Sequence, residues 1–206
     1  MLHEINHPLL QHKLTALRDV NTGSKEFREL ASEITLLLAY EALKGVELGD
    51  REIETPLTAM TGKQVRNDIV IVPVLRAGIG MLDGMLTLVP TAKVGFVGMY
   101  RDPETKEPVE YYCKLPENLH EPVAIIIDPM LATGGSLAAT VDLLKREGID
   151  NVTIVSILSA PEGIAAIEGR FPDVPIYTAA VDEYLNDHRY IVPGLGDAGD
   201  RLYGTK

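Results

Sequence analysis

The chain has 206 residues, a formal net charge of −11 and a mean hydropathy of +0.07. This length allows one α/β domain with a substantial core, so we expect residues 1–206 to form a single domain. The acidic charge argues against non-specific nucleic-acid binding, because that requires a basic surface. With no recognisable signal peptide and no apolar run of roughly 18 residues, we expect a cytoplasmic protein without a membrane partner. The single cysteine excludes an internal disulfide and a cysteine-based zinc site.

Strand-like and helical patterns alternate along the chain. Residues 25–44 have the spacing of an amphipathic helix that stops at Gly45, and Ile53–Met60 has the alternation of a short strand. The further strand-like segments are 68–75, 92–100, 123–127, 152–158 and 176–181, and the further helical segments are 81–88, 136–147 and 161–169. This alternation predicts an α/β fold with a mostly parallel sheet flanked by helices.

Two segments depart from that alternation. Residues 101–116 are charged and contain three prolines, which predicts a loop or hairpin arm. The glycine-rich C-terminal tail is expected to form a small hood. In open α/β sheets the ligand lies outside the carboxyl ends of the strands. We therefore expect three loops to meet at one edge, namely residues 76–80, residues 128–136 and the segment after Val181.

The second of these loops follows an apolar strand and has the sequence Asp128-Pro-Met-Leu-Ala-Thr-Gly-Gly-Ser136. Backbone N–H groups of a small-residue loop and of the following helix N-terminus can bind a phosphate, and the glycines let the backbone approach it. Asp128, at the strand end, is well placed for ribose hydroxyls or a metal-bound sugar. On these residues alone, a plain strand-to-helix turn is the alternative. No lysine follows the glycines, so this is not a Walker A loop, and it is not G-x-G-x-x-G.

Two arginines lie in the other polar segments. Arg76 follows an apolar strand, where a guanidinium is costly unless it meets an anion, so it is either a pyrophosphate clamp or the partner of a structural carboxylate. Arg101 is in the predicted arm, which is either a solvated turn or a mobile element that covers bound pyrophosphate and excludes water.

The tail Tyr190-Ile-Val-Pro-Gly-Leu-Gly-Asp-Ala-Gly-Asp-Arg201 is either frayed or folded over the site. A folded loop offers alternating backbone N–H and C=O groups. Uracil presents acceptor, donor and acceptor along one edge, which matches N–H, C=O and N–H. Cytosine would leave buried donors facing each other, and such mismatches cost ~10⁴-fold or more in selectivity.

Four segments, in chain order the ones around Arg76, around Arg101, at 128–136 and at 190–201, together resemble the bacterial uracil phosphoribosyltransferases. These enzymes are a family of type I phosphoribosyltransferases. Most of that superfamily has two adjacent acids where this chain has Asp128-Pro129, and the proline matches the uracil enzymes. The resemblance implies transfer of 5-phosphoribosyl from its 1-diphosphate to uracil, giving UMP and diphosphate, with Mg²⁺. It implies donor binding by Arg76, Arg101, Asp128, Pro129, Met130, Leu131, Ala132, Thr133, Gly134, Gly135, Ser136 and Asp197. It implies uracil binding by Ile191, Gly196, Asp197 and Ala198.

Other expectations are broader. No general base and no direct protein ligand to a metal can be assigned. Asn21–Arg28 is similar to the segment near which some members bind an activating GTP, or it is simply a helix start capped by Thr22 or Ser24. We expect a homodimer or higher homo-oligomer. The rival functions are an RNA-binding attenuator on the same fold, which the acidic charge disfavours, and a phosphoribosyltransferase for another base.

Overall fold

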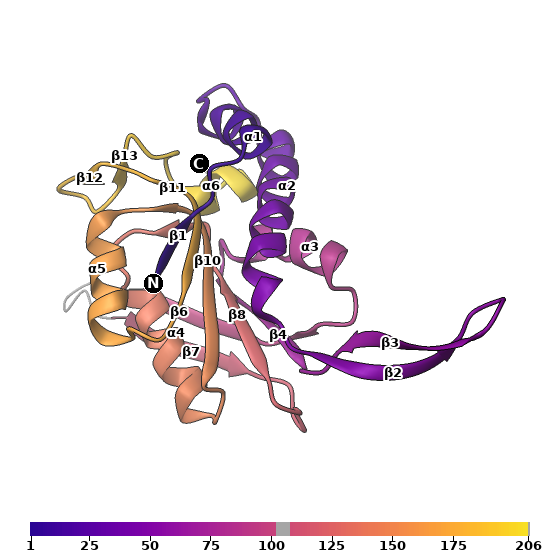
Figure 1. The fold of residues 1–206 in the computed structure, drawn as a ribbon. Helices are drawn as coiled ribbons and strands as arrows, with labels where there is room; N and C mark the ends of the chain where they lie inside the picture. Colours follow the sequence, from indigo (N-terminus) through magenta and orange to yellow (C-terminus); the bar gives the residue numbers. More distant parts are fainter. Residues whose placement is uncertain (102–107, 206) are drawn as a thin grey trace.

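The computed structural model describes residues 1–101 and 108–205 (Figure 1). The strands are β1 (Leu2–Glu4), β2 (Leu48–Glu54), β3 (Ala59–Val65), β4 (Ile69–Leu75), β5 (Lys93–Val94), β6 (Phe96–Arg101), β7 (Pro108–Lys114), β8 (Val123–Ile127), β9 (Met130–Leu131), β10 (Asn151–Ser159), β11 (Ile176–Val181), β12 (Tyr184–Leu185) and β13 (Ile191–Val192). The helices are α1 (Pro8–Arg18), α2 (Ser24–Ala42), α3 (Ile79–Leu88), α4 (Gly135–Arg146), α5 (Pro161–Arg170) and α6 (Ala198–Tyr203), with a 3₁₀ turn at Leu43–Gly45.

The main sheet has the order β1-β11-β10-β8-β4-β6-β7, and its neighbours are parallel except for the β6–β7 hairpin. The predicted α/β class, with a mostly parallel sheet flanked by helices, is therefore confirmed. The chain leaves β4 toward β6 on one side and leaves β8 toward β10 on the other. The strand order thus reverses between β4 and β8, and in open α/β sheets a crevice forms at the carboxyl ends of such a strand pair.

Both faces of the sheet are covered, because the central strands are apolar on both sides. In β4 the side chains of Ile69 and Ile71 join α1, α2 and α3 on one face, whereas Val70 and Val72 join α4 and α5 on the other. Successive residues of a strand point to opposite faces, so a near-continuous apolar run is what a doubly covered strand needs. Burying each such side chain contributes roughly 1.5–3 kcal/mol.

The hairpin of β2 and β3 projects from this body (Figure 1). The sequence pattern predicted one strand over Ile53–Met60, and that prediction is wrong. Residues 55–58 form a turn in which the N–H of Thr55 donates to the carbonyl of Thr58 (2.9 Å), and the chain reverses there. Polar alternation continues on both sides of the turn, so periodicity alone did not reveal the break.

Several smaller features also differ from the sequence-based prediction. Helix α1 was not predicted, although Pro8 at its start and its buried Leu10, Leu14 and Leu17 suit a short helix. The cap of α2 is Gly23, not Thr22 or Ser24, because the Thr22 hydroxyl donates to the carbonyl of Ala16 instead. Within the described residues, no helix is both long and apolar enough to cross a membrane.

Candidate active site

The loop after β4 is pressed against the end of β8. A Cβ atom at Gly78 would lie 2.5 Å from the carbonyl oxygen of Ile127 and 2.6 Å from the nitrogen of Val74. Only glycine allows this approach. The loop is also joined to α6, because the Tyr203 hydroxyl donates to the carbonyl of Arg76 at 3.0 Å. The loops after β4 and β8 are therefore neighbours at the point where the strand order reverses.

Arg76 lies on the surface of this junction. Its side chain is 63% exposed, and its nearest acidic partner is the Asp200 carboxylate at 4.0 Å. This is a loose contact, so Asp200 does not neutralise Arg76 as a buried ion pair would. The exposure also removes the desolvation cost that the sequence suggested. Arg76 is therefore an exposed cation, available to an anion, on the loop that follows β4.

The 128–136 loop bends back onto the sheet before it reaches its glycine pair. The carbonyl of Pro129 accepts from the N–H groups of Ile157 (3.1 Å) and Leu158 (3.0 Å), and Leu131 is fully buried. Pro129 and Leu131, which were predicted to bind the phosphoribosyl substrate, therefore hold the loop against the sheet. Gly134, with φ +80°, is the N-cap residue of α4, so the free peptide N–H groups of the first helical turn point out of this end of the helix.

Asp128 is the most perturbed acid of the site. Burial raises the pKa of its carboxyl to about 7, and the opposing hydrogen bond from the Met130 N–H, at 3.3 Å, only partly offsets that effect. The side chain is half-buried and keeps some contact with solvent. A carboxyl that changes charge near neutral pH at a strand end is a candidate functional group.

The 191–198 loop (Ile191 to Ala198) folds over the same edge. Gly196 has φ +81°, Leu195 is buried, and Asp197 caps α6 by accepting from the Asp200 N–H at 2.9 Å. Ile191 and Ala198 are each 4% exposed. The tail is therefore a folded hood, as predicted, and not a frayed end.

All three loops meet at one cavity of about 200 Å³, as the sequence predicted. The residues that line it are Ala77, Asp128, Met130, Ala132, Arg189, Tyr190, Ile191, Gly196, Asp197, Ala198 and Gly199. A neighbouring cavity of about 420 Å³ is lined by Thr133, Glu162, Leu185, Asn186, Asp187 and again Arg189. Six other predicted residues line neither cavity: Arg76, Pro129, Leu131 and Gly134 lie on the same loops, and Gly135 and Ser136 begin α4.

Arg189 is a candidate that the sequence did not reveal. It lines both cavities, is exposed, and has φ +67°, a backbone conformation that is uncommon for residues other than glycine. No ion pair or hydrogen bond of its guanidinium is found among the residues that the structure describes. Its position next to Tyr190 in the tail was the available signal.

Comparison with known proteins shows the family to which this chain belongs. The family model described as uracil phosphoribosyltransferase matches residues 4–205. The chain belongs to the uracil phosphoribosyltransferase family. Its relatives include the uracil phosphoribosyltransferase of Alkaliphilus metalliredigens, 60% identical over 98% of this chain and 97% of that protein. The uracil phosphoribosyltransferase of Clostridioides difficile is 58% identical over 98% of each chain.

Solved structures agree on the fold of this family member. A protein from Aquifex aeolicus has a TM-score of 0.93 and 42% identity, covering 100% of this chain and 99% of that chain. An adenine phosphoribosyltransferase from Trypanosoma brucei has a TM-score of 0.58 and 16% identity, covering 95% of this chain and 88% of that one. The second likeness shows the type I phosphoribosyltransferase fold alone.

The arm of this uracil phosphoribosyltransferase family member is the β6–β7 hairpin, which confirms the predicted hairpin (Figure 1). Arg101 is the last residue of β6, and its backbone pairs with Pro108. The side chain of Arg101 and residues 102–107 lie outside the described part of the chain. The predicted contact of Arg101 with pyrophosphate therefore stays a prediction.

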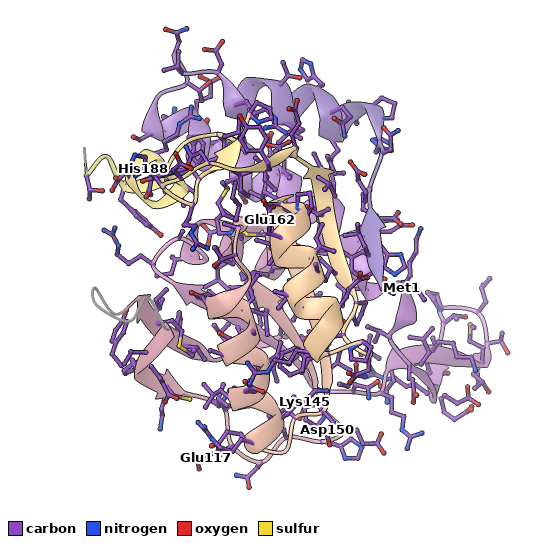
Figure 2. All side chains as sticks on the ribbon, turned by 90° about the vertical axis from the view of Figure 1, so that its left-hand side faces the viewer. Met1, Glu117, Lys145, Asp150, Glu162 and His188 are labelled. Atoms are coloured by element: carbon purple, nitrogen blue, oxygen red, sulfur yellow. The ribbon has the colours of Figure 1, made fainter. Side chains whose placement is uncertain are left out.

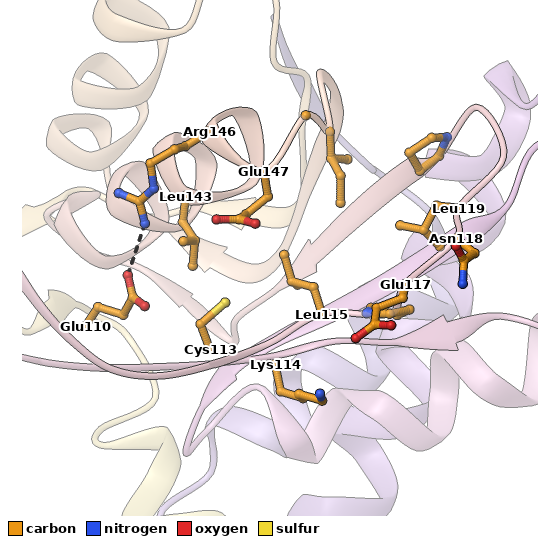
Figure 3. Close-up of a pocket in the computed structure, with 14 residues that line it drawn as sticks. Glu110, Cys113, Lys114, Leu115, Glu117, Asn118, Leu119, Leu143, Arg146 and Glu147 are labelled. Atoms are coloured by element: carbon orange, nitrogen blue, oxygen red, sulfur yellow. Dashed lines mark hydrogen bonds and ion pairs between the residues drawn. The ribbon is translucent and has the colours of Figure 1, made fainter.

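A larger cavity, of about 620 Å³, lies away from these loops (Figure 3). It is lined by β7 and the C-terminal end of α4, and one side is bridged by the Arg146–Glu110 ion pair at 3.4 Å. Figure 2 shows Glu117, from this cavity, near the bottom of the view, well below His188 and Glu162. None of the family-motif residues lines it, so cavity size does not locate the chemistry here.

Proposed function

We propose that this chain transfers the 5-phosphoribosyl group of 5-phospho-α-D-ribose 1-diphosphate to N1 of uracil. The bond from ribose C1 to the diphosphate oxygen breaks, the bond from C1 to uracil N1 forms, and N1 gives up its proton. The products are UMP and diphosphate. The observation that carries the proposal is the meeting of the three motif loops at one cavity, in a chain that belongs to the uracil phosphoribosyltransferase family.

The donor would occupy the side of the site built by β8 and α4. The 5-phosphate would lie on the Thr133–Ser136 loop, where the helix N-terminus supplies N–H donors and a positive dipole end. Asp128 would accept hydrogen bonds from the ribose hydroxyls. Arg76 and Arg101 would hold the diphosphate and offset the charge that develops on it as it leaves.

Uracil would lie in the 200 Å³ cavity against the 191–198 loop. Ile191 offers an apolar wall, and the backbone of Gly196, Asp197 and Ala198 offers hydrogen-bonding groups. This recognition needs no polar side chain, so it depends on the shape of the loop. Asp197 lies beside both the base and the ribose. Backbone donors would also stabilise the N1 anion, which is consistent with the lack of an assignable general base.

The residues of this site suit a magnesium ion that is held mainly by the diphosphate of the phosphoribosyl substrate. Within residues 1–101 and 108–205, no three His, Cys, Asp or Glu side chains are grouped to hold a metal. Mg²⁺ commonly keeps several waters and binds through substrate phosphates plus one or two carboxylates, and Asp128 offers one. When bound to the diphosphate, it would supply positive charge to the leaving group.

We further propose that the chain works as one catalytic domain in a homo-oligomer. The β2–β3 hairpin exposes Leu48, Ile53, Leu57, Met60 and Val65. An isolated two-stranded hairpin is marginally stable in water, so the exposed apolar side chains of the β2–β3 hairpin need to pack against another surface. A second copy of the chain supplies that surface. Light scattering of wild type and of Leu57→Asp would test this, and a wild-type monomer would contradict it.

The decisive test is a panel of bases with the ribosyl donor, followed by chromatography of the products. We expect UMP from uracil, no product from cytosine or hypoxanthine, and loss of turnover in EDTA. Preference for another base would support the rival phosphoribosyltransferase, and RNA binding without turnover would support the attenuator. The same assay with GTP tests the proposed activation near Asn21–Arg28. An unchanged rate would remove it.

A further inference from the structure

One ion pair outside the cavity holds the peptide on which the 191–198 loop turns. Asp182 follows β11 and is 7% exposed, and Arg18 is the last residue of α1. The Asp182 carboxylate accepts from the two terminal nitrogens of Arg18, Nη2 at 2.6 Å and Nη1 at 2.8 Å. This is the two-point geometry that only arginine can offer a carboxylate.

The same ion pair forms hydrogen bonds with both backbone polar groups of Gly194, its N–H and its carbonyl. The N–H of Gly194 donates to Oδ2 of Asp182 at 2.8 Å, and its carbonyl accepts from Nη1 of Arg18 at 2.7 Å. Gly194 has φ +64°, and a Cβ atom there would lie 2.1 Å from the carbonyl oxygen of Ile191. The turn is therefore restricted to glycine, and its orientation is fixed by two side chains from distant parts of the chain.

A second arginine holds the next residue of the loop. Nη1 of Arg201 donates to the carbonyls of Leu195 (2.9 Å) and Leu17 (2.8 Å), and its guanidinium lies 4.4 Å from the ring centre of Phe27. The loop is thus tied to the C-terminal end of α1 at two successive residues. Gly196 and Asp197, which follow directly, line the cavity.

We propose that Arg18 and Asp182 are positioning residues that set the backbone geometry for base recognition. This rests on the proposed function, since it assigns the cavity to uracil. Neither side chain is among those that line the cavity within the described residues. They act through Gly194, so that the N–H and C=O groups of residues 196–198 face the base in one fixed register. A loop released from this pair samples other backbone orientations and recognises the base less well.

The proposal predicts that changes at Arg18 or Asp182 weaken the binding of uracil but not the binding of the phosphoribosyl donor. Asp182→Asn keeps the size of the side chain but leaves too few acceptor positions for both Arg18 and the Gly194 N–H. Arg18→Lys keeps the charge but loses the two-point contact. We expect KM for uracil to rise about 10-fold in each variant, while the Kd of the donor, measured by calorimetry, stays within twofold. The preference for uracil over 2-thiouracil should also fall, because a loosened loop discriminates less well between oxygen and sulfur.

A matched control is Arg170→Lys, the same substitution in the Arg170–Asp142 ion pair between α5 and α4 on the other face of the sheet. It should leave the uracil KM unchanged. An unchanged uracil KM in both folded variants, or equal losses of donor and uracil binding, would overturn the proposal. If the wild-type chain instead uses another base, the proposed function fails, and the same KM comparison with that base still tests the positioning role.

Discussion

Asp128→Asn should make the unliganded protein more stable while it removes activity. The folded protein raises the pKa of the Asp128 carboxyl to about 7, above the ordinary value of 3.8. The folded state therefore holds this proton to a higher pH than the unfolded chain does. Stability from this group is complete below about pH 4 and is lost as the pH rises through 7. The neutral asparagine removes that loss and can still accept from the Met130 N–H.

The size of the gain follows from the two pKa values. At about 1.4 kcal/mol per pKa unit, the difference sets an upper bound of about 4 kcal/mol above pH 7. The carboxylate keeps partial contact with solvent, so we expect about 2 kcal/mol at pH 8 and close to none at pH 4. Activity should fall at least ~10-fold in kcat/KM, because the charge-assisted contact to the ribose hydroxyls or the metal is lost.

Urea unfolding of wild type and Asp128→Asn at pH 4, 6 and 8 would measure the gain in the free energy of unfolding. Steady-state kinetics would measure the fall in kcat/KM. Asp83→Asn, at an exposed position on α3, is the matched control and should show neither effect. A variant that is no more stable than wild type at pH 8, or equally stabilised at pH 4 and pH 8, would refute the desolvation argument. Wild-type activity would make Asp128 structural.

Three further outcomes are expected. Arg101→Ala should lower activity with little change in melting temperature, and a large loss of stability with normal kinetics would contradict its placement on the arm. Ala198→Val should raise the uracil KM while the donor Kd stays near wild type, because a β-branched side chain fills space beside the base. An unchanged KM would mean that the base lies elsewhere. Arg189→Gly should weaken donor binding several-fold, because it removes a cation that lines both cavities beside the 128–136 loop, and it should not destabilise the fold, because glycine adopts φ +67° freely. Unaltered donor binding would remove Arg189 from the site.

The positions of the motif loops could be predicted because a small number of general rules of α/β folds determine them. An apolar strand followed by Asp128 and a Gly-Gly pair implies a strand-to-helix junction, and parallel strands bring such junctions to one edge. The doubly covered strands were visible for a related reason, since β4 is apolar at nearly every position. The cavity shared by Ala77, Asp128 and Ala198 confirms that reasoning.

The supporting contacts could not be predicted, because they join residues far apart in the sequence. Nothing local to Arg18 or Asp182 indicates that they meet, and 164 positions separate them. Arg189 was missed because it lies outside the recognised motifs, and its proximity to Tyr190 in the tail was the only local signal that it lines the cavity. The break at residues 55–58 was missed because a polar hairpin keeps its alternation through the turn.

The link between α1 and α6 also bears on how the protein is made. Arg201 and Leu17, which are hydrogen-bonded, are 184 positions apart, and Leu202 is fully buried. The ribosome adds roughly 5–20 residues per second, so α1 and the donor loop are synthesised several seconds or more before α6. A nascent chain that ends before Leu195 contains the strands of the sheet and the 128–136 loop, but it lacks half of the loop proposed to bind the base. Translation therefore completes the proposed base site last, and a prematurely terminated polypeptide keeps the proposed donor-binding elements without it.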